Sequence, residues 1–490
     1  MSFEHIGLAG LAAYLVLLGA IAEIARRSRR DRSPADHFLA GRDLGTLVLF
    51  LTLYATAYSG NSLLGYPGKA YRSGFSFIMA TGFMMAIITV FHVLVPRLRP
   101  LAQARGFVTP GDWVRHRFAA AASRAQSSPQ GKYGRPLVVC IGVLMSVALM
   151  NFLLAQLKAM GHVTSHMTGN AVPYEWAVVG MAGLILFYET RGGMRAVAWT
   201  DAAQGILMFF GLGTLLFWLI GDAGGLGAIT RSVAQVRPDA VAVPDAATCA
   251  NWFSTIALLG LASVIYPQAI QRIYAAESAK ALRQSFALMS FMPLVTTLVV
   301  TLIGIAAITK VTVSSQFETD AVMPLLLNEW AAGGGLVTLG AVVVFLGALA
   351  AIMSTADSCL LSLGSLLLRD IWGRSGTDAA STRLGKLLAG LLLLAMIPLA
   401  LQRDLTLWRL IELKMELLVQ CVPAFLVGLH WRRLSAGATL AGLLLGTTFA
   451  VGLTLWGIPR LLGVHVGIVG LGLNLAVAWL GSLASPREGT

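Results

Sequence analysis

The sequence has few charged residues for its length. Asp, Glu, Lys and Arg together make up 12% of the 490 residues, whereas soluble domains carry about 25%. Apolar residues reach 57%, and the mean hydropathy is +0.75. Such a composition is typical of a polytopic membrane protein, and the length suits roughly a dozen spans of about 20 residues. The low charge therefore argues against a soluble domain of useful size.

Cysteine is scarce as well. The four cysteines are Cys140, Cys249, Cys359 and Cys421, and all but Cys249 fall in apolar segments. This distribution predicts neither a disulfide framework nor a CxxC metal site. The histidines are scattered without metal-ligand spacing, and the sequence lacks HExxH, GxSxG and P-loop motifs. We therefore expect no catalytic centre, no enzymatic activity and no cofactor beyond a simple ion.

Positive charge gathers in alternate loops. The net charge of +13 would suit a nucleic-acid-binding protein if it were concentrated on one face. Instead, basic runs follow the first apolar segment, at 26–32, and fill the longest loop, at 97–135. Lys and Arg favour the cytoplasmic loops of membrane proteins. The pattern predicts thirteen spans in a bacterial-type inner membrane, with the N-terminus outside, the C-terminus cytoplasmic and no nucleic-acid partner.

The apolar segments form two groups of five spans. We expect an all-α membrane protein of one domain, with a leading helix at about 5–25, groups at about 45–221 and about 251–431, and trailing helices at about 436–482. The first span of each group is broken by Pro or Gly, and these two spans run in opposite directions. This arrangement is typical of a five-plus-five inverted repeat with its site near the middle of the membrane.

Three connecting segments have patterns of their own. Thr109-Pro110-Gly111-Asp112 is typical of a helix cap and predicts a short surface helix that ends near Phe118. The run ETRGGMRA at 189–196 predicts a tight inner turn between the fifth and sixth spans. The segment at about 309–333 is polar enough to carry a surface or re-entrant helix on the outer side.

The first broken span contains the most unusual stretch, LYATAYSGNSLLGYPGKAYRSG at 53–74. Its breakers are Gly60, Gly65, Pro67 and Gly68, and polar side chains surround the first of them. In hydrocarbon, an unpaired backbone amide or carbonyl costs several kcal/mol. A broken helix at this depth therefore persists only against protein or a water-filled cavity, where freed carbonyls can hold an ion or a ligand.

The ninth span, at about 336–368, offers oxygen atoms to the same place. Ala351, Ser354 and Thr355 are spaced by three and four residues, so they share one helix face. With two freed carbonyls they would form an uncharged five-oxygen cage suited to a monovalent cation, since Ca²⁺ prefers carboxylates and more ligands. The alternative is that both hydroxyls bond to carbonyls one turn earlier. Because the broken span is also present, we favour the ion site.

Five stretches together resemble the sodium:solute symporter family. They are FLAGRDLG before the first broken span, YSGNSLLGYPGKAYRSG within it, GGMRAVAWTDAAQ at the inner turn, IQRIYAA after the second broken span, and STADSCLLSLGSLLLRDIW in the ninth. Each motif is loose by itself, and the set is specific. The resemblance covers nearly the whole chain and implies a leucine-transporter-like inverted repeat with one leading and two trailing helices.

The resemblance also implies a sodium site. Matching the motifs residue by residue places its carbonyl ligands at Ala55, Tyr58 and Ala351, and its hydroxyl ligands at Ser354 and Thr355. Sodium is thus the expected coupling ion and the only expected metal.

The chain departs from two branches of the family that it resembles. Ala57 stands where proline-carrier-like members have a carboxylate, and Tyr266 and Gln268 stand where sugar-carrier-like members have Asn and Tyr. We therefore expect neither a proline carrier nor a sugar carrier.

Three polar residues beside the breaks are candidates for solute binding. Asn61 and Ser62 lie just beyond the first break, and Gln268 follows the second break at Pro267. Each would face the cavity that a broken span requires.

A polar stripe on the eleventh span supplies two more candidates. Arg409, Glu412, Glu416 and Gln420 are spaced by three, four and four residues, and Lys414 points away from them. We assign Arg409 and Glu412 to a salt-bridge network. We assign Glu416 and Gln420, which lie deeper, to the solute.

Acidic residues near the predicted site have two interpretations. Asp357 lies two residues inward of Thr355 and could guide the ion toward the cytoplasm. Alternatively, it forms a salt bridge inside the bundle with an inner-loop Arg. We assign Glu189 and Asp201 to a cytoplasmic salt-bridge cluster with Arg191 and Arg195, and Arg272 to an inner loop.

These patterns predict a secondary active transporter in which Na⁺ entry drives uptake of a small polar organic solute by alternating access. The solute class is an organic acid, an amino acid or a vitamin-like molecule, and the expected partners are Na⁺, the solute and membrane lipid, with the monomer as the functional unit. One alternative is a transporter-like sensor that works with a separate signalling partner. Another is a proton-coupled carrier that uses Asp357 or Glu416.

Overall fold

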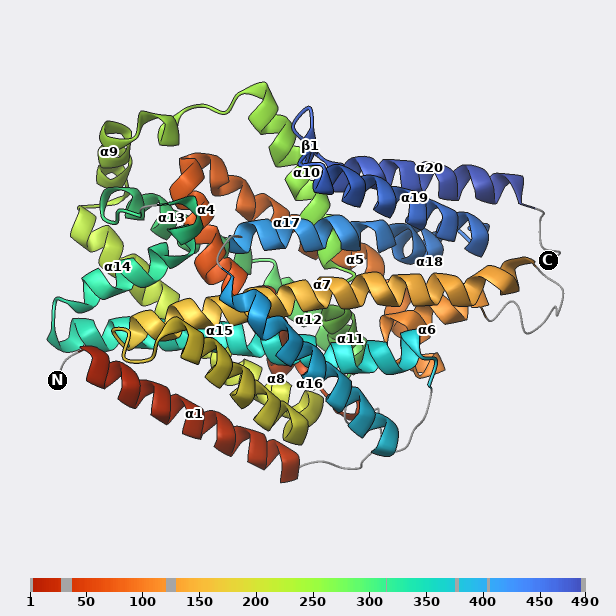
Figure 1. Cartoon of the computed structure of the whole chain (residues 1–490), viewed down its shortest axis with the longest axis horizontal. Coiled ribbons are helices and arrows are strands. Elements are labelled where there is room, and N and C mark those ends of the chain that lie inside the picture. The colour runs from red at the N-terminus through yellow and green to blue at the C-terminus, as the bar shows by residue number, and fades with distance from the viewer. Residues whose placement is uncertain are drawn as a thin grey trace.

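The computed structural model describes residues 3–27, 38–119, 129–313, 315–374, 379–402 and 406–485, and these are almost entirely helical (Figure 1). Among the long helices, α7 packs against both α15 and α19. The helices are α1 Phe3–Arg27, α3 Thr46–Ala57, α4 Tyr66–Ser73, α5 Met79–Arg105, α6 Pro110–Val114, α7 Pro129–Met167, α8 Tyr174–Ala223, α9 Leu226–Val236, α10 Ala246–Ser263, α11 Pro267–Ala275, α12 Ala279–Met289, α13 Leu298–Ala306, α14 Val322–Ala331, α15 Gly335–Leu366, α16 Ala379–Leu401, α17 Leu407–Leu418, α18 Gly428–His430, α19 Ala436–Leu455 and α20 Val466–Ala484, and the strands are β1 Arg460–Leu461 and β2 Val464–His465.

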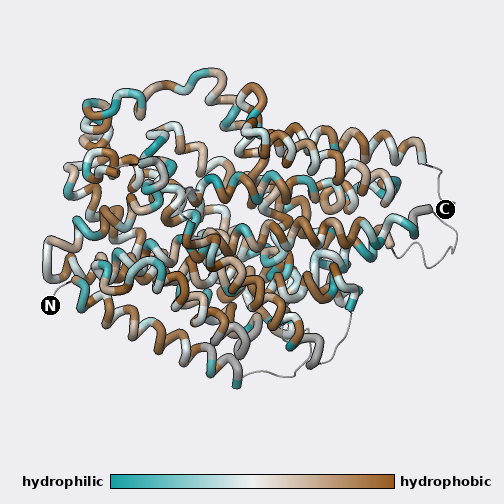
Figure 2. Tube along the Cα trace, in the orientation of Figure 1, coloured by the Kyte–Doolittle hydropathy of each residue, from teal (hydrophilic) through white to brown (hydrophobic). Residues whose placement is uncertain are grey.

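The described residues contain ten helices that are long and apolar enough to cross a membrane. Two shorter apolar helices, Thr46–Ala57 and Tyr174–Leu186, add to these. Hydrophobic residues dominate the long helices, as Figure 2 shows. The predicted all-α membrane architecture is therefore confirmed, whereas the count of thirteen spans and the repeat layout stay predictions.

One connecting segment differs from the sequence prediction. The inner turn predicted at 189–196 falls mostly on residues 187–193 of α8, which lie outside the residues described in detail, so it stays a prediction. The cap predicted at Thr109 is present, since Thr109 and Asp112 form a reciprocal capping box at the start of α6. This short helix is buried, and not on the surface as predicted. Local capping signals gave the start of α6, but burial depends on neighbours that are distant in the sequence.

Helix α15 forms the centre of the bundle. Residues 347–366 are all buried, and α15 packs against α7, α8, α14 and α16. A Cβ atom on Gly347 would lie 3.2 Å from the carbonyl oxygen of Leu207, so the glycine lets α8 approach closely. This packing fixes the face of α15 that carries Ser354 and Thr355.

The segment before α14 connects two parts of the bundle. Asp320 lies just before α14 and is buried, and its Oδ2 accepts a hydrogen bond of 2.7 Å from the amide of Leu407 at the start of α17. The backbone of Thr319 packs against α4, because a Cβ atom on Gly68 would lie 2.5 Å from the Thr319 carbonyl oxygen. The predicted outer segment thus joins α4 to α17.

Burial of Asp320 predicts a pH dependence of stability. Desolvation raises the pKa of its carboxyl from 3.8 to about 6, although the Leu407 amide and Arg72 act in the opposite direction. The folded state therefore holds this proton more tightly than the unfolded state, so the stabilisation is complete below pH ~4 and is lost as the pH rises through ~6. A shift of about two pKa units corresponds to roughly 3 kcal/mol.

Thermal unfolding of the detergent-purified protein between pH 4 and pH 8 tests this prediction. Wild type should lose stability across the interval by more than Asp320→Asn, which keeps an acceptor oxygen for the Leu407 amide but cannot titrate. Parallel pH profiles for the two proteins would contradict it.

Candidate functional site

The first predicted break lies at the end of α3. The helix ends at Ala57, because Tyr58 leaves the helical region with φ −107° and ψ 88°. Two residues later, the amide of Gly60 donates a 3.0 Å hydrogen bond to Oε1 of the buried Gln156 in α7, and not to a carbonyl one turn earlier. The side chain of Gln156 thus compensates an amide that the break exposes. The prediction of a broken helix at this position is confirmed.

The break packs directly against α15. A Cβ atom on Gly60 would lie 2.7 Å from Cγ1 of Ile352, so a glycine is needed for this contact. The break and the hydroxyl-bearing part of α15 are therefore neighbours. All the residues predicted to hold sodium are buried: Ala55, Tyr58, Ala351, Ser354 and Thr355.

The two predicted hydroxyl ligands differ in their hydrogen bonds. Oγ1 of Thr355 donates to the carbonyl oxygen of Ala351 at 3.1 Å, which is the local bond that the alternative interpretation required. Oγ of Ser354 is buried, makes no hydrogen bond to its own helix, and has the Asp201 carboxylate as its neighbour. A hydroxyl that donates to a carboxylate still has lone pairs for an ion, so Ser354 fits the ion site, whereas the bond of Thr355 fits the alternative. The sodium site as a set of five ligands stays a prediction.

A buried ion pair lies close to Ser354 in space. Arg272 and Asp201 are both fully buried, and Nη2 of Arg272 lies 2.7 Å from Oδ2 of Asp201. The guanidinium also donates to Oγ of Ser358 at 2.6 Å and to Oγ1 of Thr52 at 2.9 Å. The hydroxyl of Thr52 donates in turn to Asp201. This network joins α3, α8, α11 and α15.

The sequence interpretation of these charges was wrong. Arg272 lies in α11 inside the bundle and not in an inner loop, and Asp201 pairs with it rather than with Arg195. The guanidinium of Arg195 instead donates to the carbonyl oxygen of Ala40 at 3.1 Å. Asp357 is also fully buried on α15, and both roles predicted for it stay open.

A cavity of about 90 Å³ lies between the two breaks. The second break is confirmed, since α10 ends at Ser263 and α11 begins at Pro267. Apolar side chains form most of the cavity wall, among them Phe152 and Met415. Ligand sites in proteins are typically apolar cavities with a few well-placed polar groups.

Several polar atoms of this cavity lack partners within the described part of the chain. They are Oγ1 of Thr56, both side-chain polar atoms of Asn61, the hydroxyl of Tyr266 and Oε1 of Gln268. Buried polar atoms are nearly always hydrogen-bonded, so several without partners at one cavity indicate a place for a polar molecule. The structure brings Asn61, Ser62 and Gln268 together at this cavity, as the sequence predicted.

The cavity also contains a cation that the sequence interpretation did not place there. Lys414 lines it with only 1% of its surface exposed. Its Nζ lies 3.2 Å from the ring centroid of Phe152 and 5.7 Å from that of Tyr266. Helical spacing correctly placed Lys414 and Glu416 on different faces of α17. It could not show which of these faces lines the cavity.

The structure places the other two solute candidates away from the cavity. Glu416 accepts a hydrogen bond from Thr454 at 3.1 Å and lies 3.4 Å from His465, the last residue of β2. Nε2 of Gln420 donates to the carbonyl oxygen of Gly467 at 2.8 Å. Both side chains therefore connect the eleventh span to α19 and α20.

The salt-bridge network predicted for the other end of the stripe is confirmed. Glu412 is 3.1 Å from Arg409 and 2.6 Å from Arg460. Its Oε1 also accepts a hydrogen bond of 2.8 Å from the indole of Trp408. Glu412 therefore joins α17 to the β1–β2 hairpin.

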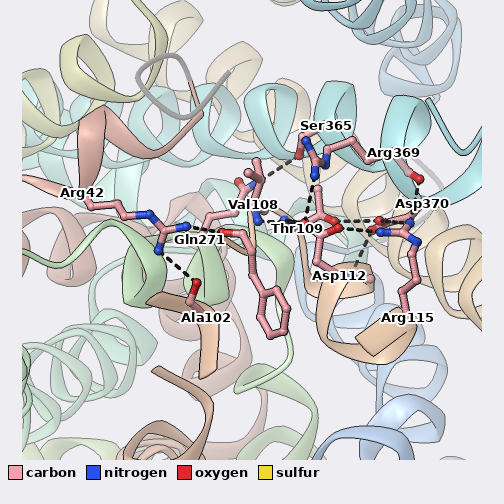
Figure 3. Close-up of polar contacts among 12 residues, drawn as sticks. Arg42, Ala102, Val108, Thr109, Asp112, Arg115, Gln271, Ser365, Arg369 and Asp370 are labelled. Atoms are coloured by element: carbon pink, nitrogen blue, oxygen red, sulfur yellow. Dashed lines mark hydrogen bonds and ion pairs between the residues drawn. The ribbon is translucent and has the colours of Figure 1, made fainter. Parts of the chain in front are cut away.

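A second polar cluster connects α6 to the end of α15 (Figure 3). Oγ1 of Thr109 donates to Oδ1 of Asp370 at 2.6 Å, and the amide of Gly111 donates to Oδ2 at 3.1 Å. Nη1 of Arg115 lies 2.5 Å from Oδ1 of Asp112. A Cβ atom on Gly111 would lie 2.2 Å from Cγ of Asp370. These contacts hold the short helix in place on the side that the charge pattern assigns to the cytoplasm.

Comparisons with known proteins agree with this architecture. A family model described as sodium:solute symporter family matches residues 37–446. The chain is 25% identical to the sodium/pantothenate symporter of Escherichia coli (strain K12), over 96% of this chain and 95% of the relative. It is 24% identical to the high-affinity proline transporter of Bacillus subtilis (strain 168), over 86% and 87%. A solved Na⁺-coupled sialic acid symporter shares its fold, with a TM-score of 0.77, 17% identity and 99% coverage of both chains.

Proposed function

Because the chain belongs to the sodium:solute symporter family, we propose that it uses Na⁺ entry to take up a small polar organic solute by alternating access. The family and its fold are those of Na⁺-coupled transporters, so the chain is a membrane symporter and not an enzyme. Na⁺ and a small-molecule solute are accordingly its partners. The class of solute, the residues that bind it and the orientation in the membrane belong to the proposal.

The observation that carries this proposal is the cavity between the two helix breaks. Its wall is mainly apolar, yet Thr56, Asn61, Tyr266 and Gln268 present polar atoms there without partners among the described residues. A bound solute with hydrogen-bonding groups would form hydrogen bonds with these atoms, and these bonds would break when the solute is released. Breaks in two spans are also where transporters of this architecture place their ligands.

The sodium ligands in this proposal are the carbonyls of Ala55, Tyr58 and Ala351 and the hydroxyls of Ser354 and Thr355. Two features support them. Gly60 brings the break in α3 into contact with α15, and the buried hydroxyl of Ser354 does not bond to its own helix. An uncharged oxygen set suits a monovalent cation better than a divalent one.

The driving force is sufficient for concentrative uptake. One cation that crosses 100 mV releases about 2.3 kcal/mol, and a tenfold gradient adds about 1.4 kcal/mol. The sum of about 3.7 kcal/mol supports a solute ratio of several hundred. A single coupled Na⁺ is therefore enough in principle.

The solute is, on this proposal, an organic acid, an amino acid or a vitamin-like molecule. The relatives named above are described as carriers of pantothenate, proline and sialic acid. Ala57 lines the cavity, so the pocket has an uncharged methyl group where proline-carrier-like members have a carboxylate.

A thermal-unfolding screen of the purified protein against a solute library tests the coupling. Solutes that raise the melting temperature should do so more in NaCl than in choline chloride at the same pH, because Na⁺ and solute bind cooperatively. The leading solute should then enter proteoliposomes in response to an inward Na⁺ gradient. Stabilisation and uptake that follow pH and ignore Na⁺ would indicate a proton-coupled carrier, and binding without uptake would indicate a sensor.

A further inference from the structure

Lys414 is the one basic side chain among the described residues that line the cavity. These lining residues include no Asp, Glu, Arg or His. Lys414 is 1% exposed, and its Nζ contacts the face of Phe152 at 3.2 Å. No ion pair joins it to a carboxylate within the described part of the chain.

A buried cation without an anion is unfavourable in a membrane protein, and such residues usually mark a ligand or ion pathway. The ring of Phe152 compensates for part of the lost hydration through a cation–π contact. A carboxylate in the cavity would compensate for much more, because a charge-assisted hydrogen bond in a site of low dielectric constant is strong.

We propose that the transported solute is an organic anion whose carboxylate binds Lys414, and that it carries no ammonium group. This inference rests on the proposed function and specifies its substrate class. A zwitterion would need an anionic partner for its ammonium group, and the cavity offers none among its described lining residues. Ala57, at the first break, supplies only a methyl group.

The remaining wall describes the rest of the solute. Phe152, Met415 and their neighbours suit an aliphatic or aromatic body. The amide of Asn61 and Oε1 of Gln268, which lack partners within the described residues, suit a hydroxyl or amide group on that body. The expected substrate class is therefore a small hydroxy- or amido-substituted monocarboxylate.

A matched set of small molecules tests the charge assignment. Two carbon bodies, 3-phenylpropanoyl and 4-methylpentanoyl, are each used as the carboxylate, the 2-hydroxy acid, the primary amide and the 2-amino acid. Thermal unfolding of the purified protein in NaCl, over a range of each compound, gives apparent affinities. We expect the carboxylates and hydroxy acids to bind about 30-fold or more tightly than the amides and amino acids, as is typical of a buried charge pair.

Variants of Lys414 provide the second part of the test. Lys414→Met should leave the melting temperature without ligand unchanged or higher, because it removes an uncompensated buried charge. The same change should abolish the preference for carboxylates over amides, whereas Lys414→Arg should retain part of it. Lys280→Met, at an exposed position of α12, should behave as wild type.

The outcomes separate this inference from the function on which it rests. Equal or tighter binding of the amides or amino acids, retention of the carboxylate preference in Lys414→Met, or no binding of any carboxylate would overturn the inference. Carboxylate binding that depends on Lys414 but is the same in NaCl and choline chloride would support the inference and overturn the sodium coupling.

Discussion

Replacing Arg272 with Met should destabilise the protein by about 3–5 kcal/mol, because it leaves Asp201 as an unpaired charge in the interior. Both members of this pair are fully buried at a separation of 2.7 Å. The guanidinium also donates to Thr52, Ser358 and the carbonyl oxygen of Gln268. The variant therefore loses contacts to α3 and α15, in addition to the charge pair.

The double variant Arg272→Met with Asp201→Leu distinguishes charge burial from lost packing. It removes both charges, so we expect it to be considerably more stable than Arg272→Met alone. Arg409→Met is a matched control, because Arg409 is 26% exposed and Glu412 keeps Arg460 as a partner. Thermal unfolding in detergent measures these three variants and the single variant Asp201→Leu. A double variant as unstable as the sum of its two single variants would contradict the charge argument.

The two helix breaks could be predicted because their signals are local. Gly60 and Pro267 both disfavour a continuous helix, and polar side chains around them at that depth require a cavity or a protein partner. The structure places α3's end at Ala57 and α11's start at Pro267. Sequence reasoning was also right that Asn61 and Gln268, far apart in the chain, reach a common cavity.

The partners of buried charges could not be predicted, since they depend on which faces of distant helices meet. Helical spacing separated Lys414 from Glu416, but it carries no information on which of the two faces the cavity. Glu416 contacts His465, 49 positions further along the chain. Arg272 was assigned to a loop for a related reason. Its place near a helix end suggests a loop, and its burial can be predicted only if its partner, Asp201 in α8, is known.

Thr355→Ala should remove the sodium dependence of uptake, with apparent Na⁺ affinity at least tenfold weaker, as expected for one lost contact to a charged group. The bond from Thr355 to the Ala351 carbonyl does not decide its role, because a hydroxyl that donates to a carbonyl can still offer a lone pair to an ion. A functional comparison is therefore needed, in proteoliposomes with NaCl or choline chloride outside.

Two further variants make the comparison specific to the ion. Thr355→Ser keeps the hydroxyl and should retain Na⁺-dependent uptake. Thr439 makes the same kind of bond, from Oγ1 to the Ser435 carbonyl at 2.7 Å, in the trailing helix α19. If the hydroxyl of Thr355 serves only its helix, Thr355→Ala and Thr439→Ala should affect uptake alike and leave its Na⁺ dependence unchanged. If it is a sodium ligand, only Thr355→Ala should lose that dependence. Both variants lose a hydroxyl-to-carbonyl bond within a helix, but only Thr355→Ala would also lose a contact to the ion.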